Sequence, residues 1–152
     1  MALGLSNNYE QRVLNYIFKQ TAPPTPASEL WYGLNGSTPG DTGASEIAAT
    51  GGYARAGLFP DATSVSHVRY NAITTSGDNS RITNLLDITF PQATTGGFNA
   101  GSAIGWWTVW DGLTAANVIA AGTITGTVVV LESNTLKFAG SVSGGALSFD
   151  VD

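Results

Sequence analysis

The side chains that could carry out acid–base or nucleophilic chemistry in this chain are few and dispersed. His67 is the sole histidine, and it stands among serines and valines. Many serines could be paired with it on paper, but none has the strand–turn–helix elbow that exposes a nucleophilic serine. Zinc needs three or four histidine, cysteine or carboxylate ligands, and the chain has no cysteine. We therefore expect His67 to be a surface or hydrogen-bonded residue without a catalytic role.

Oxygen ligands for calcium would have to come from aspartates that are far apart in the sequence. Asp150 and Asp152 share one face of an expected strand, while Asp41 and Asp61 fall in expected loops. No spacing typical of a calcium-binding loop links them, which favours solvated charges. The acidic residues single out no facing carboxylate pair, and the glycine pairs lack the lysine of a phosphate-binding loop. The sequence predicts no catalytic residue, no metal and no cofactor.

The element around which the chain is organised is the segment 104–111, which carries three of the four tryptophans. Successive side chains of a strand point to opposite faces. One face is expected to carry Ile104, Trp106, Thr108 and Trp110, and the other Trp107 and Val109. Large apolar groups on both faces predict a central strand that is covered on both sides. The tryptophans could also stack on sugar rings, but their alternation within a strand favours core packing.

Short apolar runs recur roughly every 10–15 residues with glycine, asparagine and serine between them. The expected strands are 29–34, 51–59, 85–90 (stopped by Pro91), 104–110, 118–124, 127–131, 134–138 and 146–151, and residues 61–81 are ambiguous. No alternation of strands with helices is present, so a parallel sheet is not expected. The pattern predicts a mainly β fold, an antiparallel β-sandwich or jelly roll with one N-terminal α-helix.

The helix is predicted over residues 7–20, where Ser6, Asn7 and Asn8 offer capping oxygens. Its apolar stripe consists of Tyr9, Val13, Leu14, Ile17 and Phe18. The stripe can pack on its own domain or dock on a neighbouring subunit. Three prolines within residues 23–26 enforce an extended spacer after the helix. We expect residues 1–28 to form a helical arm with its spacer and residues 29–152 to form the β-sandwich domain.

The composition excludes several classes of partner. Charged residues make up only 11% of the chain, the formal net charge is −5, and the six basic residues are scattered. Binding to nucleic acid through phosphate neutralisation is therefore not expected. No apolar run is long enough to span a membrane, and the N-terminus lacks the features of a signal peptide. A surface with so few charges suits a subunit that buries much of its surface in an assembly.

The order of several short motifs resembles a family of small tailed-bacteriophage virion proteins. The motifs are the amphipathic helix with Leu14-Asn15-Tyr16-Ile17-Phe18, then Leu30-Trp31-Tyr32-Gly33-Leu34, Gly51-Gly52-Tyr53-Ala54-Arg55, Ile88-Thr89-Phe90-Pro91 and the strand ending in Trp110-Asp111. The likeness covers nearly the whole chain. This sequence departs from the family in its tryptophans at 106, 107 and 110, where smaller aromatics are usual. The family has no catalytic residues to transfer.

The resemblance implies a non-enzymatic structural protein located on the virion. Our first interpretation is a capsid decoration or cement protein that contacts the major capsid protein and sister copies, as a homo-oligomer such as a trimer. The alternative is a tail fibre, tail adaptor or receptor-binding tip, in which residues 35–50 and 92–101 would read a host glycan. A hydrolase of cell-envelope polymer is a third possibility that the missing catalytic constellation disfavours. Deletion of residues 1–28 is expected to leave a folded domain that no longer joins particles.

Overall fold

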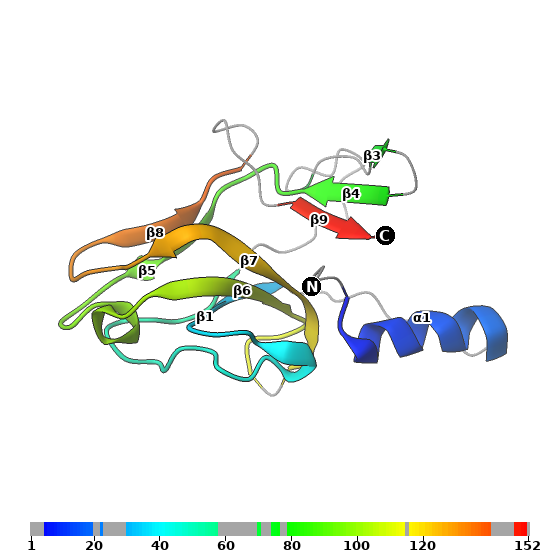
Figure 1. Cartoon of the computed structure of the whole chain (residues 1–152), viewed down its shortest axis with the longest axis horizontal. Coiled ribbons are helices and arrows are strands. Elements are labelled where there is room, and N and C mark those ends of the chain that lie inside the picture. Colours follow the sequence, from blue (N-terminus) through cyan, green and yellow to red (C-terminus); the bar gives the residue numbers. More distant parts are fainter. Residues whose placement is uncertain are drawn as a thin grey trace.

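The computed structural model describes residues 5–19, 22, 30–57, 70, 74–76, 79–114, 116–140 and 148–151. Within them, one N-terminal helix is followed by antiparallel strands (Figure 1). The elements are α1 (Asn7–Lys19), β1 (Trp31–Asn35), η1 (Gly40–Thr42), β2 (Ala56–Gly57), β3 (Thr74–Ser76), β4 (Asn79–Thr83), β5 (Ile88–Gln92), η2 (Phe98–Gly101), β6 (Ile104–Trp110), β7 (Val118–Val128), β8 (Thr135–Phe138) and β9 (Ser148–Val151). The predicted mainly β fold with a single N-terminal helix is confirmed.

The strands of the described residues form three antiparallel sheets. The largest has the order β2-β1-β6-β7, a second has the order β3-β4-β9, and β5 pairs with β8 in a third. The β5–β8 pair lies over one face of the largest sheet, and the two layers enclose the core (Figure 1). We call the part of the chain that contains these sheets the body.

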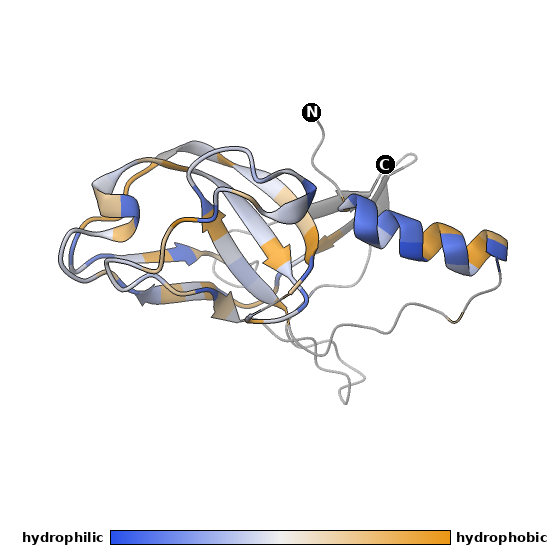
Figure 2. Ribbon diagram, turned by 90° about the horizontal axis from the view of Figure 1, so that it is seen from below, coloured by the Kyte–Doolittle hydropathy of each residue, from blue (hydrophilic) through white to orange (hydrophobic). Residues whose placement is uncertain are grey.

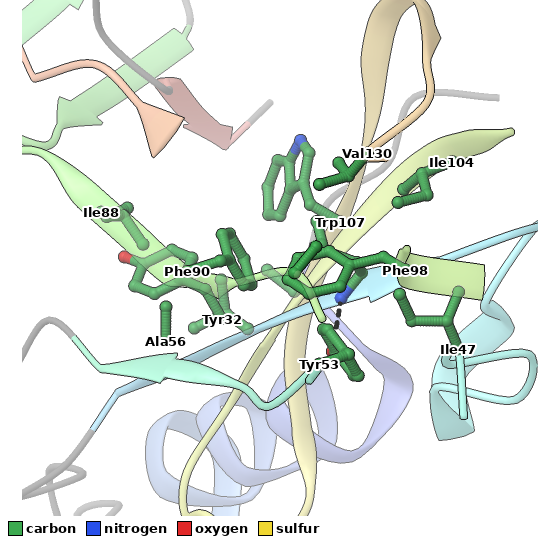
Figure 3. Close-up of a cluster of buried hydrophobic side chains, with 14 residues drawn as sticks. Tyr32, Ile47, Tyr53, Ala56, Ile88, Phe90, Phe98, Ile104, Trp107 and Val130 are labelled. Carbon is green, nitrogen blue, oxygen red and sulfur yellow. Dashed lines mark hydrogen bonds between the residues drawn. The ribbon is translucent and has the colours of Figure 1, made fainter. Parts of the chain in front are cut away.

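The core is built from alternate residues of the facing strands. Tyr32 and Leu34 come from β1, and Ile88 and Phe90 come from β5; all four are at most 1% exposed. Trp107 of β6 lies among them (Figure 3). This is the burial pattern of a two-layered sandwich, in which the inward residues of both layers interdigitate.

β6 is the central strand that its tryptophans predict, because it pairs with β1 on one side and β7 on the other. Trp107 and Val109 point into the core, as expected. Ile104, however, belongs to the same core cluster and not to the face of Trp106. The pairing with β7 is irregular between Ile104 and Trp106, with the extra residues in β7, and the strict alternation of β6 is broken between Ile104 and Trp107.

Several expected strand bounds are wrong: the strand expected over residues 51–59 begins only at Ala56, and two other bounds differ for local reasons. β5 continues through Pro91 to Gln92. The pairing of β5 with β8 is irregular between Thr89 and Gln92, so no ladder hydrogen bond is required from the proline nitrogen. β7 is one strand of 11 residues, where two shorter strands were expected, and it passes through Gly126 at a φ of 86°.

Candidate interaction site

The chain enters α1 from the edge of β7. Leu5 forms an antiparallel bridge with Ala120, and the Ser6 amide donates to the carbonyl oxygen of Ile119 at 2.8 Å. The Ser6 hydroxyl, expected to cap the helix, instead donates to the carbonyl oxygen of Val118 at 2.5 Å. Because Ser6 is only 4% exposed, these bonds fix the point at which the helix leaves the body.

The first turn of α1 is tied to the body by polar side chains. The side-chain hydrogen bonds join Asn7 Nδ2 to Asp41 Oδ2 (2.6 Å), Asn8 Nδ2 to Asn117 Oδ1 (3.3 Å) and the Tyr9 hydroxyl to Asp111 Oδ2 (3.0 Å). We call these six residues the anchor. Beyond it, the helix projects away from the sheets (Figure 2). The anchor therefore holds the helix at one end only.

Asp111 is the centre of the anchor. Besides the Tyr9 hydroxyl, it accepts hydrogen bonds from the Asn117 amide at 2.7 Å and from Asn117 Nδ2 at 2.9 Å. Partial burial alone would raise the pKa of Asp111, but these hydrogen bonds and the positive charge of Arg12 hold it below its usual value. Burial, together with the neighbouring carboxylate of Asp111, raises the pKa of Tyr9 to about 12. At neutral pH the anchor thus pairs a neutral phenol with an ionised carboxylate.

The outer part of α1 exposes a set of large apolar side chains that we call the helix face. The exposed fractions are 39% for Val13, 52% for Leu14, 47% for Tyr16, 57% for Ile17 and 76% for Phe18. No residue of α1 is buried by the described part of the chain. Figure 2 shows the apolar residues gathered in the half of the helix away from the sheets. Contiguous exposed apolar surface of this kind marks interaction sites.

The helix face contains four of the five predicted interaction residues. Tyr9, the fifth, is half-buried at the anchor with its hydroxyl on Asp111. Tyr16 was not predicted, although its spacing of three from Val13 and seven from Tyr9 places it on the same side of the helix. The helical periodicity is therefore sufficient to predict Tyr16 as a residue of the apolar side. No sequence signal could have paired Tyr9 with a carboxylate 102 positions away.

Trp110 lies on the opposite face of β6 from the core, where a polar network covers it. The guanidinium carbon of Arg55 is 3.7 Å from the centre of its ring. Arg55 also binds both carboxylate oxygens of Glu46, at 2.9 and 2.6 Å, and donates to the carbonyl oxygens of Gly112 and Leu113. With Trp110 only 7% exposed, its indole ring does not line an open cleft. The network instead fixes the loop that follows β6 and carries Asp111.

Two loops meet at the end of the sheet opposite the anchor. Asn35, at the end of β1, pairs with Trp106 near the start of β6. The anchor residue Asp111 comes directly after Trp110, at the other end of β6. A Cβ atom at Gly36 would lie 3.3 Å from Nδ2 of Asn99, so the loop after β1 lies against η2. This contact joins the start of the segment 35–50 to the segment 92–101, whereas Asp41, later in the first segment, belongs to the anchor. The body therefore presents loops at one end and the helix at the other.

The residues weighed for chemistry do not come together in the described structure. His67, Asp61, Asp152 and the proline-rich spacer lie outside the described residues. Asp41 binds Asn7 in the anchor. Among the described residues, His, Cys, Asp and Glu side chains form no group of three or more that could hold a metal ion. No helix in the described part of the chain is long and apolar enough to cross a membrane.

Comparison with known proteins gives one family. A family model described as podophage GP4 fiber I protein gp80 matches residues 4–144. No curated protein matches the chain. The matched residues include α1, the anchor and the strands from β1 to β8. Since the match covers far more than half of the 152 residues, the chain belongs to the family of podophage GP4 fiber I protein gp80.

Proposed function

We propose that this protein is a non-enzymatic component of a phage tail fibre and that α1 joins its body to a neighbouring virion protein. Membership of a fibre family makes it a virion structural protein. The observation that carries the proposal is the exposed helix face, held away from the body by the anchor. The family description favours a fibre over our first interpretation, a capsid decoration protein.

The position of the protein in the virion separates the two interpretations. Quantitative mass spectrometry of purified particles counts its copies relative to the major capsid protein. A fibre component is expected in a few dozen copies or fewer, and antibody labelling should mark the tail. Hundreds of copies spread over the head would instead establish capsid decoration.

In this proposal, residues 1–28 form the arm and residues 29–152 form the body. Deletion of residues 1–28 would also remove Leu5 and Ser6 and so uncover the edge of β7. A cleaner test therefore changes only the helix face. Ile17→Glu should leave the body folded and reduce incorporation into particles, because it puts a charge in the contact. The matched control is Leu131→Glu, since Leu131 is 56% exposed and Ile17 57%.

The loops at the opposite end are the part of the body available to a host receptor. They are rich in exposed glycine, serine and threonine, and in this arrangement they would contact a neutral host glycan. Catalysis is not part of the proposal, and the structural role of the family supports its absence. Incubation of the purified protein with host polysaccharide or peptidoglycan tests this point. Clear turnover would replace the fibre proposal with a hydrolase.

A further inference from the structure

We propose that Trp106 is a stacking platform for a neutral saccharide at the end of the sheet opposite the anchor. This inference rests on the proposed function and deepens it, because it names the residue and the class of sugar in the glycan contact. Trp106 lies in β6 on the face that points away from the core, as do Thr108 and Trp110. Its register partners are Asn35 at the end of β1 and the exposed Thr123 of β7.

The ring of Trp106 is less covered than the rings of the other two tryptophans of β6. Trp106 is half-buried and is not part of the core cluster, whereas Trp107 and Trp110 are 6% and 7% exposed. The Arg55 guanidinium lies on the Trp110 ring. Among the described residues, neither a guanidinium nor an aromatic ring stacks on Trp106. β6 therefore presents one indole ring whose surface is partly open.

The indole N–H of Trp106 adds a hydrogen-bond donor to this surface. The N–H of Trp110 donates to the Thr108 hydroxyl at 2.9 Å, but that of Trp106 has no partner among the described residues. Within this part of the chain, every buried side-chain nitrogen and oxygen has a hydrogen-bond partner. The Trp106 N–H therefore reaches solvent, where it is available to a ligand oxygen.

Glycines leave the surroundings of Trp106 free of overhanging side chains. Gly105 precedes it, and Gly36, which is exposed, follows the residue that pairs with it in β1. Gly126 lies in the part of β7 where the pairing with β6 is irregular. A Cβ atom at Gly105 or at Gly126 would meet nothing within 4 Å. An aromatic ring bordered by bare backbone is accessible to a second flat molecule.

The absence of charge indicates which molecule this is. The segments 30–40, 88–110 and 112–131, which contain β1, β6 and β7, have no charged residue. An acidic sugar would meet no cation there, and neither would the phosphates of a nucleic acid whose bases could stack on the ring. A neutral pyranose fits instead, because its C–H face lies on the indole while its hydroxyls bond the N–H and the neighbouring hydroxyl side chains.

Fluorine NMR of the full-length chain labelled with fluorotryptophan observes each of the four tryptophans separately. The signals of Trp106, Trp107 and Trp110 are assigned as those lost in the respective phenylalanine variants. The Trp106 signal should shift between ordinary and heavy water more than the other two, because it is the more exposed ring. Equal solvent shifts for the three rings would overturn the open platform.

A titration then tests the ligand class. Maltohexaose, cellohexaose and mannohexaose are the neutral probes, and hexagalacturonate is the acidic probe of the same length. At least one neutral probe should shift the Trp106 signal in a saturable way, with the Trp107 and Trp110 signals unchanged. The inference is wrong if no neutral probe does so, or if hexagalacturonate binds equally well.

Substitutions measure what the ring contributes to this binding. Trp106→Leu keeps an apolar side chain but removes the aromatic face and the N–H, so the affinity should fall at least about fivefold. Trp106→Phe keeps a ring face and should lie between the two. Leu113→Ala removes apolar surface near the anchor, where Leu113 is 46% exposed, and should leave the affinity unchanged. Urea midpoints check that the variants fold, and an unchanged affinity of folded Trp106→Leu would contradict the platform.

Particle assembly separates this inference from the proposed function. Particles that carry Trp106→Leu should contain the normal number of copies, since α1 and the anchor are untouched, but should adsorb less to host cells. If the saccharide probes do not bind while the chain is found in the tail, the platform falls and the fibre role stands. If the chain is found on the head, the fibre role falls, whatever Trp106 binds.

Discussion

A substitution of Gly122 by alanine probes the packing of the central tryptophan. Gly122 of β7 is the register partner of Trp107 in β6. A Cβ atom at this position would lie 2.1 Å from Cζ2 and 2.3 Å from Cε2 of the Trp107 indole. Real Cβ contacts are never this close, so the ring or the strand has to move. Trp107 is 6% exposed and part of the core cluster, which leaves its ring no free space.

The magnitude follows from two opposing effects. Overpacking a core costs about 1–3 kcal/mol. Replacing glycine by alanine also restricts the unfolded chain, which stabilises the fold by about 0.4–1 kcal/mol where the backbone accepts it. We therefore expect Gly122→Ala to lower the free energy of unfolding by about 1–2 kcal/mol. Gly105 is the matched control in β6, because a Cβ atom there would meet nothing within 4 Å.

Urea unfolding followed by tryptophan fluorescence measures both variants. Gly122→Ala should lower the midpoint without changing the slope, and Gly105→Ala should leave the midpoint equal or slightly raised. For a chain of about 150 residues, 1 kcal/mol corresponds to a shift of the melting temperature of about 2–4 °C. If both variants are as stable as the native chain, the indole is not held against Gly122 and the register of β6 with β7 is wrong.

Four further predictions concern Trp110 and the anchor. Gly43→Ala should destabilise the body by about 1–3 kcal/mol more than Gly40→Ala in thermal melts, because both glycines have positive φ but only at Gly43 would Cβ collide with the Trp110 ring. Arg55→Lys should cost about 1–3 kcal/mol, since lysine cannot bind both oxygens of Glu46 while lying flat on Trp110, and urea unfolding tests it. The lowered pKa of Asp111 stabilises the anchor above about pH 4, so the protection of the α1 amides, measured against the intrinsic exchange rate at each pH, should fall as the pH falls below this value, and Asp111→Asn should abolish that dependence. The raised pKa of Tyr9 acts in the opposite sense: its contribution is complete below about pH 10 and is lost as the pH rises through about 12.

Periodicity was sufficient for the class of fold and for the helix face. The alternation around Trp107 predicted a central strand, and the 3.6-residue spacing from Val13 to Phe18 predicted one apolar side of a helix. Both signals are local, and packing in the body does not override them. The strand end at Pro91 and the face of Ile104 were predicted wrongly, because irregularities in the pairing, which depend on the partner strand, lie at both places.

Contacts between distant residues could not be predicted from one sequence. Arg55 and Glu46 are nine positions apart, and nothing in their spacing indicates that both lie on the outer side of the sheet beside Trp110. Tyr9 has the spacing of an interface residue, yet a hydrogen bond to Asp111 makes it part of the anchor. The contacts of these residues depend on β6 and the loop after it, which come more than 50 positions later in the sequence.

The division of α1 into a polar first turn and an apolar outer part has a consequence for the energetics of docking. An isolated helix of 13 residues is only marginally stable in water. Its first turn is unfavourable to form, and a short helix has few further hydrogen bonds to offset that free energy. The anchor supplies that nucleus by fixing the first turn at Asn7, Asn8 and Tyr9. No residue in the turns beyond it is buried by the described part of the chain, so a docked partner must stabilise the helix as well as bind it. Weakening the anchor should therefore weaken docking even though no anchor residue belongs to the helix face.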